Sequence, residues 1–281
     1  MDQFDSLICV DYSAAAKPTS GQDSIWLAGY LLGSKVLMNH STRASAHEWL
    51  NTAMVEHVSL GKRVLIGFDF AFGYPTGFAA ALGLTGTPWK STWKYLERTL
   101  IDRPNNENNR FEVANAINKK LGDKAVFWGR PHQLNLPFLP TKKNICYDNG
   151  IKEWRQFEAL GREKGSLISR MQPSWKLAYA GSVGSQALMG IANLQRHREK
   201  FAEKLAIWPF EEPTSPIVFA EVYPSMFKFE HIPHRIKDAK QVQAAVQVMK
   251  RNSLSNWLDR TRFRDNLSVV DEEGWLLGWP Q

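Results

Sequence analysis

The chain begins with short apolar runs that alternate with polar connections. Leu7–Asp11 is apolar until it ends in a carboxylate, and two further runs, Ser24–Tyr30 and Lys35–Met38, follow on either side of the turn Leu32–Ser34. Runs of this length and composition predict β-strands. Because the connections between them are short, we expect the three strands to form an antiparallel meander.

The next segment, Ser45–His57, has helical spacing, because its apolar residues recur every three or four positions. After Gly61 a fourth apolar run, Arg63–Asp69, again ends in aspartate. A strand–helix–strand step normally makes a parallel, right-handed crossover. We therefore expect Arg63–Asp69 to lie beside the first strand and parallel to it.

From Phe70 to about Ile207 the pattern is mainly helical, with loops rich in Trp, Pro and Gly. This stretch is too long for an ordinary crossover, so we interpret most of it as an insertion. A strand and a helix come after it, and the tail resembles a short hairpin. The predicted elements are helices at Pro88–Ile101 and Gln186–Leu205, a strand at Ile217–Glu221, a helix at about Lys237–Lys250 and the hairpin at Leu267–Leu277.

The resulting order, β-β-β-α-β-insertion-β-α, predicts an α/β fold of the RNase-H-like type. Its mixed sheet would hold three antiparallel strands, with parallel strands on the other side of the first. We expect a single domain over residues 1–281, with its core formed by 1–70 and 213–281 and a large helical insertion at about 71–210.

The composition, 43% hydrophobic and 22% charged, is that of an ordinary globular protein and argues against disorder of the whole chain. No apolar run is long enough to cross a bilayer, and no secretory signal is recognisable, so we expect a cytoplasmic protein. The two cysteines, Cys9 and Cys146, lack metal-ligand spacing. Cys9 falls inside an apolar strand and is expected to be a small core residue.

The net charge of +7 is concentrated in one segment. Residues 110–176 contain 13 Lys or Arg and 6 Asp or Glu, which accounts for the formal excess. Clustered cations favour a polyanionic partner, either nucleic acid or a nucleotide-like phosphate. The alternative is that long cationic side chains only solvate a helical surface.

The carboxylates at strand ends carry the candidate chemistry. Asp11 and Asp69 should lie side by side, because adjacent strands are about 4.8 Å apart and parallel neighbours present their carboxyl ends at the same edge. A cation or a shared proton would relieve their repulsion, and Mg²⁺ or Mn²⁺ suits oxygen ligands. We expect Glu221, which ends the next strand, to be a third metal ligand, and Asp238 to be a further catalytic acid.

Each of these acids also has a simpler interpretation. Aspartate at a strand end can serve turn geometry, and Asp238, near the start of a helix, is favoured there by the helix dipole. Two apolar strands that both end in Asp, with a third that ends in Glu, favour the metal site for Asp11, Asp69 and Glu221. For Asp238 both interpretations stay open.

Four spaced motifs, Val10–Ala15, Gly67–Pro75, Ala178–Leu188 and Ala220–Pro224, resemble those of the family called domain of unknown function 429. The resemblance covers nearly the whole chain, from Asp11 to the Glu-Gly-Trp tail. It implies an RNase-H-like fold and a predicted nuclease activity, with Asp11, Asp69 and Glu221 as the metal-site acids. Asp238 corresponds less directly, because its helix has Gln241 and Gln243, and no second Asp, one turn on.

The turn Gly181–Ser185 precedes a long predicted helix. Glycine-containing turns at helix N-termini expose backbone N–H groups suited to a phosphate, which makes Ser182, Gly184 and Ser185 candidate substrate contacts. The motif lacks the Walker lysine and the Rossmann spacing. The alternative is a capped helix start with Ser182 or Ser185 as the N-cap.

Four further residues are candidate substrate contacts. Arg130 could clamp a phosphate and His132 could transfer a proton. Lys17 could neutralise a phosphate near Asp11, and Ser13 is a further candidate contact. A loop or core role for His132 and a solvated position for Lys17 are the ordinary alternatives. The eleven tryptophans could include base-stacking platforms, although most should fill the core.

Three functions are compatible with these features. The leading hypothesis is a metal-dependent phosphodiester hydrolase that acts on nucleic acid or a nucleotide-like substrate. The second is an actin-like nucleotide-binding phosphotransferase or ATPase, which usually needs two related halves where this chain has one. The third is a non-catalytic nucleic-acid-binding module, against which the retained strand-end acids argue, because buried like charges are costly.

Overall fold

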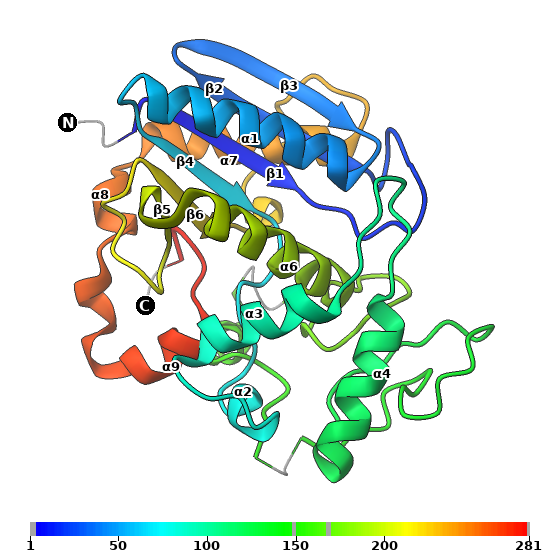
Figure 1. Ribbon diagram of the computed structural model, residues 1–281. Helices are drawn as coiled ribbons and strands as arrows, with labels where there is room; N and C mark the ends of the chain where they lie inside the picture. The colour runs from blue at the N-terminus through cyan, green and yellow to red at the C-terminus, as the bar shows by residue number, and fades with distance from the viewer. Residues whose placement is uncertain (1–3, 148–149, 167–169, 280–281) are drawn as a thin grey trace.

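A computed structural model describes residues 4–147, 150–166 and 170–279. Its centre is a six-stranded sheet in the order β3-β2-β1-β4-β6-β5 (Figure 1). The strands are β1 (Ser6–Asp11), β2 (Ile25–Leu31), β3 (Ser34–His40), β4 (Val64–Phe68), β5 (Leu205–Ile207) and β6 (Ile217–Glu221).

The sheet is mixed, as the sequence predicts. β1 pairs with β2 and β2 with β3 in antiparallel register, whereas β4 is parallel to β1 and to β6, and β5 is parallel to β6. The α/β class and the combination of antiparallel and parallel strands are therefore confirmed. This arrangement brings the carboxyl ends of β1, β4 and β6 to the same edge.

Helices cover both faces of the sheet. On one face α1 (Arg43–Ser59) and α6 (Gly184–Phe201) pack against the even-numbered residues of β1 and β4, such as Val10 and Phe68. On the opposite face α7 (Lys237–Arg251) packs against odd-numbered residues such as Cys9 and Leu65. Figure 1 shows α1 and α6 in front of the strands and α7 behind them. The free thiol of Cys9 is buried in the second core, as expected.

The remaining helices follow β4 or close the chain. They are α2 (Phe78–Ala81), α3 (Pro88–Thr99), α4 (Arg110–Leu121), α5 (Gln156–Glu163), α8 (Leu254–Trp257) and α9 (Leu267–Glu273), with 3₁₀ turns at Gly122–Lys124, Ala202–Lys204, Pro224–Met226 and Arg260–Asn266. Within the described ranges, no helix is long and apolar enough to cross a membrane.

Two elements differ from the sequence expectations. The helix predicted to continue to Leu205 ends at Phe201, because Ala202 adopts a positive φ of 45° and the chain then enters β5. β5 is thus a strand of the central sheet, and α6 packs on one face of it. Both elements fall inside residues 71–210, which the sequence pattern assigns to an insertion.

The predicted terminal hairpin is wrong. The segment forms the helix α9, and its last two residues bind the loop after β4. Glu272 accepts backbone N–H bonds from Gly77 and Ala79 at 2.9 and 2.8 Å, and Glu273 accepts one from Thr76 at 2.8 Å. The two carboxylates satisfy backbone N–H groups of the loop that would otherwise be unpaired, and this stabilises α9. The apolar pattern of the segment does not signal these contacts, so it does not predict the helix.

Candidate functional site

Asp11 and Asp69 lie side by side at the carboxyl edge of the sheet. Val10 pairs with Phe68 in the parallel register of β1 and β4, and the N–H of Asp69 donates to the carbonyl of Val10 at 2.9 Å. The two aspartates are therefore the next pair along the two strands. Residues paired in register point to the same face of a sheet, which for this pair is the face covered by α7.

Few neighbouring groups compensate the negative charges of Asp11 and Asp69. Neither side chain forms an ion pair or a hydrogen bond with any residue in the described ranges. Burial raises the pKa of Asp69 to about 7, and the nearby Glu221 and Asp238 carboxylates add to the shift. Burial and the negative charge of Asp69 also raise the pKa of Asp11 well above its usual value, and the charge of Lys237 opposes this shift more weakly. The charge of Asp69 thus makes ionisation of Asp11 harder.

Asp238 comes from α7, far along the sequence from Asp11 and Asp69, and lies near both of them. It lies in the first turn of α7, and its Oδ2 accepts a hydrogen bond from the backbone N–H of Asp23 at 3.0 Å. Its charge contributes to the raised pKa values of both Asp11 and Asp69. Three of the four predicted acids therefore lie toward the same face of the sheet.

Glu221 is placed differently. It pairs in register with Phe68, one residue before Asp69, so the strand directs its side chain to the face opposite to that of Asp69, although both carboxylates line one small cavity at the strand ends. There Arg155 donates two hydrogen bonds to it, each of 2.7 Å, and the N–H of Phe72 donates a third at 3.0 Å. The carboxylate that we expected to be the third metal ligand is thus fully occupied by protein donors.

Arg155 is the centre of a second, compensated cluster. Its guanidinium also pairs with Glu158 at 2.7 Å and donates to the backbone carbonyl of Glu273 at 3.2 Å. Arg155, Glu158 and Glu221 are each at most 2% exposed. Burial alone would lower the pKa of Arg155, but the carboxylates of Glu158 and Glu221 raise it instead. No sequence pattern links Arg155 to Glu221, and we did not predict this pair.

A cleft of about 460 Å³ opens beside the acids. Asp11, Asp23 and Asp238 line one part of it, and Tyr179, Ser182 and Ser185 come from the segment before and at the start of α6. A smaller cavity of about 150 Å³ contains Asp69 and Glu221 together with Gly181 and Val183. The turn 181–185 therefore lies over the acidic edge between the two hollows.

The glycine-containing turn has a clear packing role. A Cβ on Gly184 would lie 2.3 Å from the carbonyl oxygen of Ser174, so only glycine allows this approach of the two backbones. Val183 is the N-cap of α6, and no side chain caps it, so the predicted capping by Ser182 or Ser185 is wrong. The Ser185 hydroxyl instead donates to the carbonyl of Leu177 at 2.7 Å.

The other predicted substrate contacts separate into two groups. Ser13 lines the large cleft, where its hydroxyl donates to the carbonyl of Asp23 at 3.0 Å. Lys17 and His132 are exposed to solvent outside it. The Arg130 guanidinium donates to the carbonyls of Leu139 and Leu134 and so holds its own loop. The structure brings Ser13, but not the other three, to the lining of the acidic cleft.

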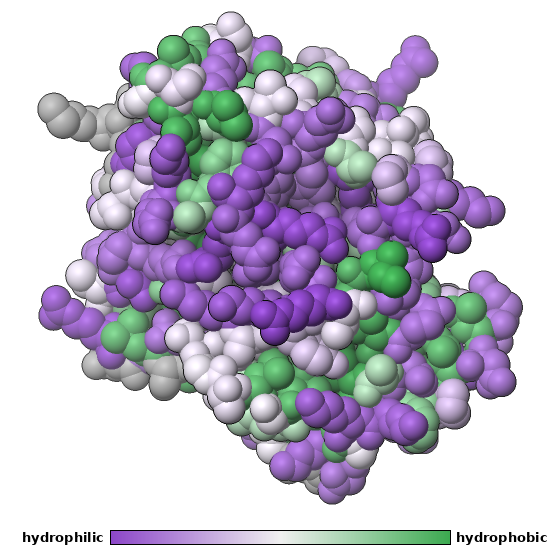
Figure 2. Space-filling view, in the orientation of Figure 1, coloured by the Kyte–Doolittle hydropathy of each residue, from purple (hydrophilic) through white to green (hydrophobic). Residues whose placement is uncertain are grey.

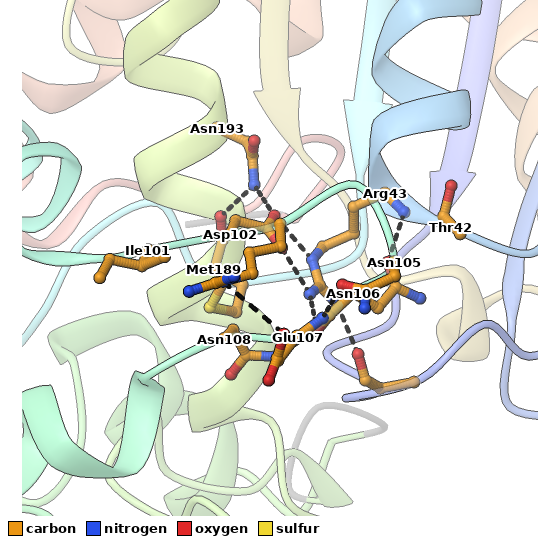
Figure 3. Close-up of polar contacts among 12 residues, drawn as sticks. Thr42, Arg43, Ile101, Asp102, Asn105, Asn106, Glu107, Asn108, Met189 and Asn193 are labelled. Carbon is orange, nitrogen blue, oxygen red and sulfur yellow. Dashed lines mark hydrogen bonds and ion pairs between the residues drawn. The ribbon is translucent and has the colours of Figure 1, made fainter.

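A buried ion pair that sequence reasoning missed holds the loop after Asp11. Arg43, which is 0% exposed, binds Asp102 through Nε at 2.8 Å and Nη2 at 2.6 Å. Its Nη1 donates to the carbonyls of Ser13 and Ala15, at 3.2 and 2.8 Å. Figure 3 shows the side chains of Arg43, Asp102 and Asn193 pointing toward one another. Asn193 donates to Asp102 Oδ2 at 2.9 Å, and so ties α6 to the same cluster.

A chain of buried polar contacts continues from Asn193 through Tyr12 and His47 to His197. The Tyr12 hydroxyl lies 3.2 Å from Asn193 Nδ2 and 2.9 Å from His47 Nε2, and His47 Nδ1 lies 2.7 Å from His197 Nε2. Burial lowers the pKa of His197 to about 4 and that of His47 well below its usual value, so both rings are neutral at pH 7. These contacts fix Tyr12, the residue directly after Asp11, in one position.

No protein-family model, curated protein or solved structure matches this chain. The site itself must therefore indicate the chemistry. Within residues 4–147, 150–166 and 170–279, no three His, Cys, Asp or Glu side chains form a ready metal-binding group. Two adjacent acids with raised pKa values are nevertheless the kind of donor set that a divalent cation would neutralise.

Other parts of the described surface differ from this cleft. On the face seen in Figure 2, hydrophilic residues cover most of the area over α1 and α6, and the hydrophobic residues form separate patches. A second hollow, of about 510 Å³, lies between the start of β1 and the end of α7, far along the strands from the acids. It contains Asp5, Lys250 and Arg251 but no buried acid pair.

Proposed function

We propose that this chain is a divalent-metal-dependent phosphodiester hydrolase with an RNase-H-like core, and that Asp11 and Asp69 are its metal ligands. The observation that carries the proposal is the pair of partly buried aspartates at the ends of adjacent parallel strands, whose carboxyl groups form no ion pair or hydrogen bond with the described residues. Leaving two such acids uncompensated is costly, and sites that tolerate this cost are commonly functional.

Mg²⁺ or Mn²⁺ bound there would neutralise both carboxylates and lower the pKa of a coordinated water. Asp11 and Asp69 would hold the ion, and Asp238 would add negative charge on the same face. Glu221 would stabilise the edge of the site through Arg155 rather than bind the ion. The ion pair of Arg43 with Asp102 would keep the Tyr12–Ala15 loop in place beside it.

The strand order and the position of the acids also support membership of the domain of unknown function 429 family. Asp11 and Asp69, from two of the motifs that carry the resemblance, lie at the edge of the sheet. The Gly181–Ser185 turn, from a third, lies over them. The positively charged segment 110–176 supports a nucleic-acid or nucleotide-like substrate, since clustered cations attract phosphates.

Metal titration tests the core of this proposal. We expect isothermal titration to show Mn²⁺ binding to the wild-type protein and to Asp259→Asn, a matched control in which an exposed aspartate is changed. Binding should be lost in Asp11→Asn and in Asp69→Asn. Equal Mn²⁺ affinity in all four proteins would contradict the metal site.

A substrate screen tests the reaction. Single-stranded DNA, duplex DNA, RNA and dinucleotides are incubated with Mg²⁺ or Mn²⁺ and the wild-type protein. Cleavage of at least one of them, abolished in Asp11→Asn but retained in Asp259→Asn, is the expected result. Binding without any cleavage would instead favour the non-catalytic module.

A further inference from the structure

Among the described residues that line the acidic cleft, Arg110 is the one cationic residue. It is the first residue of α4, and its side chain contacts Ser185, which also lines the cleft. The helix dipole presents partial positive charge at this end, so a cation is electrostatically unfavourable there. Arginine at this position therefore needs an explanation other than helix stability.

The partners of Arg110 differ from those of the two fully buried arginines. Arg43 and Arg155 each bind at least one carboxylate at 2.7 Å or less. Arg110 donates only to neutral oxygens, from Nε to Ser185 Oγ at 3.0 Å and from Nη1 to Asn108 Oδ1 at 2.7 Å. It forms no ion pair with any residue of the described chain, and its Nη2 has no hydrogen-bond acceptor there.

The neutral partners orient the guanidinium without cancelling its charge. Ser185 is itself held by the carbonyl of Leu177, and Asn108 lies two residues before Arg110. The face of the neighbouring Phe111 ring lies 4.4 Å from the guanidinium carbon and restricts it further. The carboxylates of Glu112 and Asp102 act on Arg110 only through their charge, without an ion pair. A cation that is positioned, partly desolvated and not paired with a carboxylate at hydrogen-bond distance is arranged to receive an anion.

We propose that Arg110 binds a non-bridging phosphate oxygen of the substrate, and so selects ligands whose phosphate lies between its Nη2 and the Asp11–Asp69 edge. This inference rests on the proposed function, which it deepens by assigning the residue that recognises the phosphate. Phosphate suits the site because a guanidinium donates to its oxygens in a fixed geometry. A neutral ligand would leave the charge of Arg110 uncompensated.

The test compares Arg110→Gln with Arg98→Gln. Arg98 lies on the neighbouring helix α3 and is exposed outside the cleft, so the two variants have the same net charge. Inorganic phosphate is titrated into each protein by calorimetry, once with excess Mg²⁺ and once with EDTA. We expect wild-type affinity in Arg98→Gln and a loss of at least about tenfold in Arg110→Gln, the size of one charge-assisted hydrogen bond.

A third variant, Arg110→Lys, keeps the charge and guards against misfolding of the glutamine variant. Lysine lacks the planar fork of donors, so its phosphate affinity should fall between those of the wild type and Arg110→Gln. Thermal unfolding of each variant establishes that it is folded before the titration. Equal phosphate affinity in Arg110→Lys, Arg98→Gln and Arg110→Gln, or no saturable phosphate binding by the wild type under either condition, overturns the inference.

The two proposals can fail separately. If Mn²⁺ binding depends on Asp11 while phosphate binding does not depend on Arg110, the metal site stands and the phosphate contact is wrong. If phosphate binding depends on Arg110 while no Mn²⁺ binds, the anion site stands and the metal-dependent function is wrong.

Discussion

Two groups of acids lie at neighbouring strand ends of this sheet, and only one of them forms ion pairs among the described residues. Glu221, at the end of β6, shares Arg155 with Glu158 and is buried as an ion pair. Asp11 and Asp69, at the ends of β1 and β4, have no such partner among the described residues, and their pKa values are raised. An acid at a strand end can therefore be structural or a candidate metal ligand. The difference is whether a cationic side chain forms an ion pair with it.

Loss of charge in the two groups should change the free energy of unfolding in opposite directions. Removing the cation from a buried ion pair leaves uncompensated charge and destabilises the fold strongly. Removing a charge from two like-charged acids relieves repulsion and should stabilise the fold when no cation is bound. Substitutions in the two groups should therefore shift stability in opposite directions, although the residues lie at the same edge.

The largest effect is expected for Arg155→Met. This change leaves Glu158 and Glu221 buried without a cation, and we expect a loss of about 3–5 kcal/mol in the free energy of unfolding. Urea denaturation measures it, with Arg103→Met as the matched control, because Arg103 forms an exposed ion pair with Glu107 that should contribute less than about 1 kcal/mol. A loss below 1 kcal/mol for Arg155→Met would show that the cluster does not behave as a compensated ion pair.

An effect of the opposite sign is expected for Asp69→Asn in EDTA. The pKa of Asp69 in the folded protein, about 7, lies above its ordinary value of 3.8. Between these values the folded state binds more protons than the unfolded state, so this group lowers stability as the pH rises from about 4 to 7. At pH 8 the variant should be more stable than the wild type by roughly 1–3 kcal/mol, after allowance for solvent screening.

Divalent metal should reverse that order. Added Mg²⁺ or Mn²⁺ should stabilise the wild type by mass action and leave Asp69→Asn unchanged. Thermal unfolding at pH 5 and pH 8, with EDTA and with Mn²⁺, gives all four values for each protein. The idea fails if Asp69→Asn is less stable than the wild type in EDTA at pH 8, or if it gains as much from Mn²⁺.

The strand-end aspartates could be predicted because each closes a continuous apolar run. β1 and β4 coincide with the predicted runs to within one residue at either end, since such runs predict buried strands well. The pairing of β1 with β4 then follows from the crossover between them. The mixed sheet and the position of Asp11 beside Asp69 were thus both accessible from the sequence.

The face of Glu221 could not be predicted in the same way. Its direction depends on the register of β6 against β4, where a shift of one residue reverses the face. Its partner Arg155 is separated from it by 66 residues, so no local pattern signals the ion pair. The sequence pattern predicts no helix that begins at Arg110, and its partner Ser185 is 75 residues away, so no local pattern signals its place in the cleft.

The smallest effect on stability is expected for Asp238→Asn, and it is the most selective test of which acids act together. The change removes a negative charge near Asp11 and Asp69, but it also removes a favourable charge from the first turn of α7. The Asn side chain can still accept the N–H bond of Asp23. Because the two charge effects oppose each other, the free energy of unfolding in EDTA should change by less than about 1 kcal/mol.

The pKa of Asp69 should respond even where stability does not. Removing the charge of Asp238 takes away one of the groups that raise this pKa, so it should fall toward its ordinary value in Asp238→Asn and stay near 7 in the exposed control Asp259→Asn. A pH titration followed by NMR of the carboxyl carbons measures both. If the pKa of Asp69 is the same in the two variants, Asp238 is only a helix-terminal residue, and the uncompensated group consists of Asp11 and Asp69 alone.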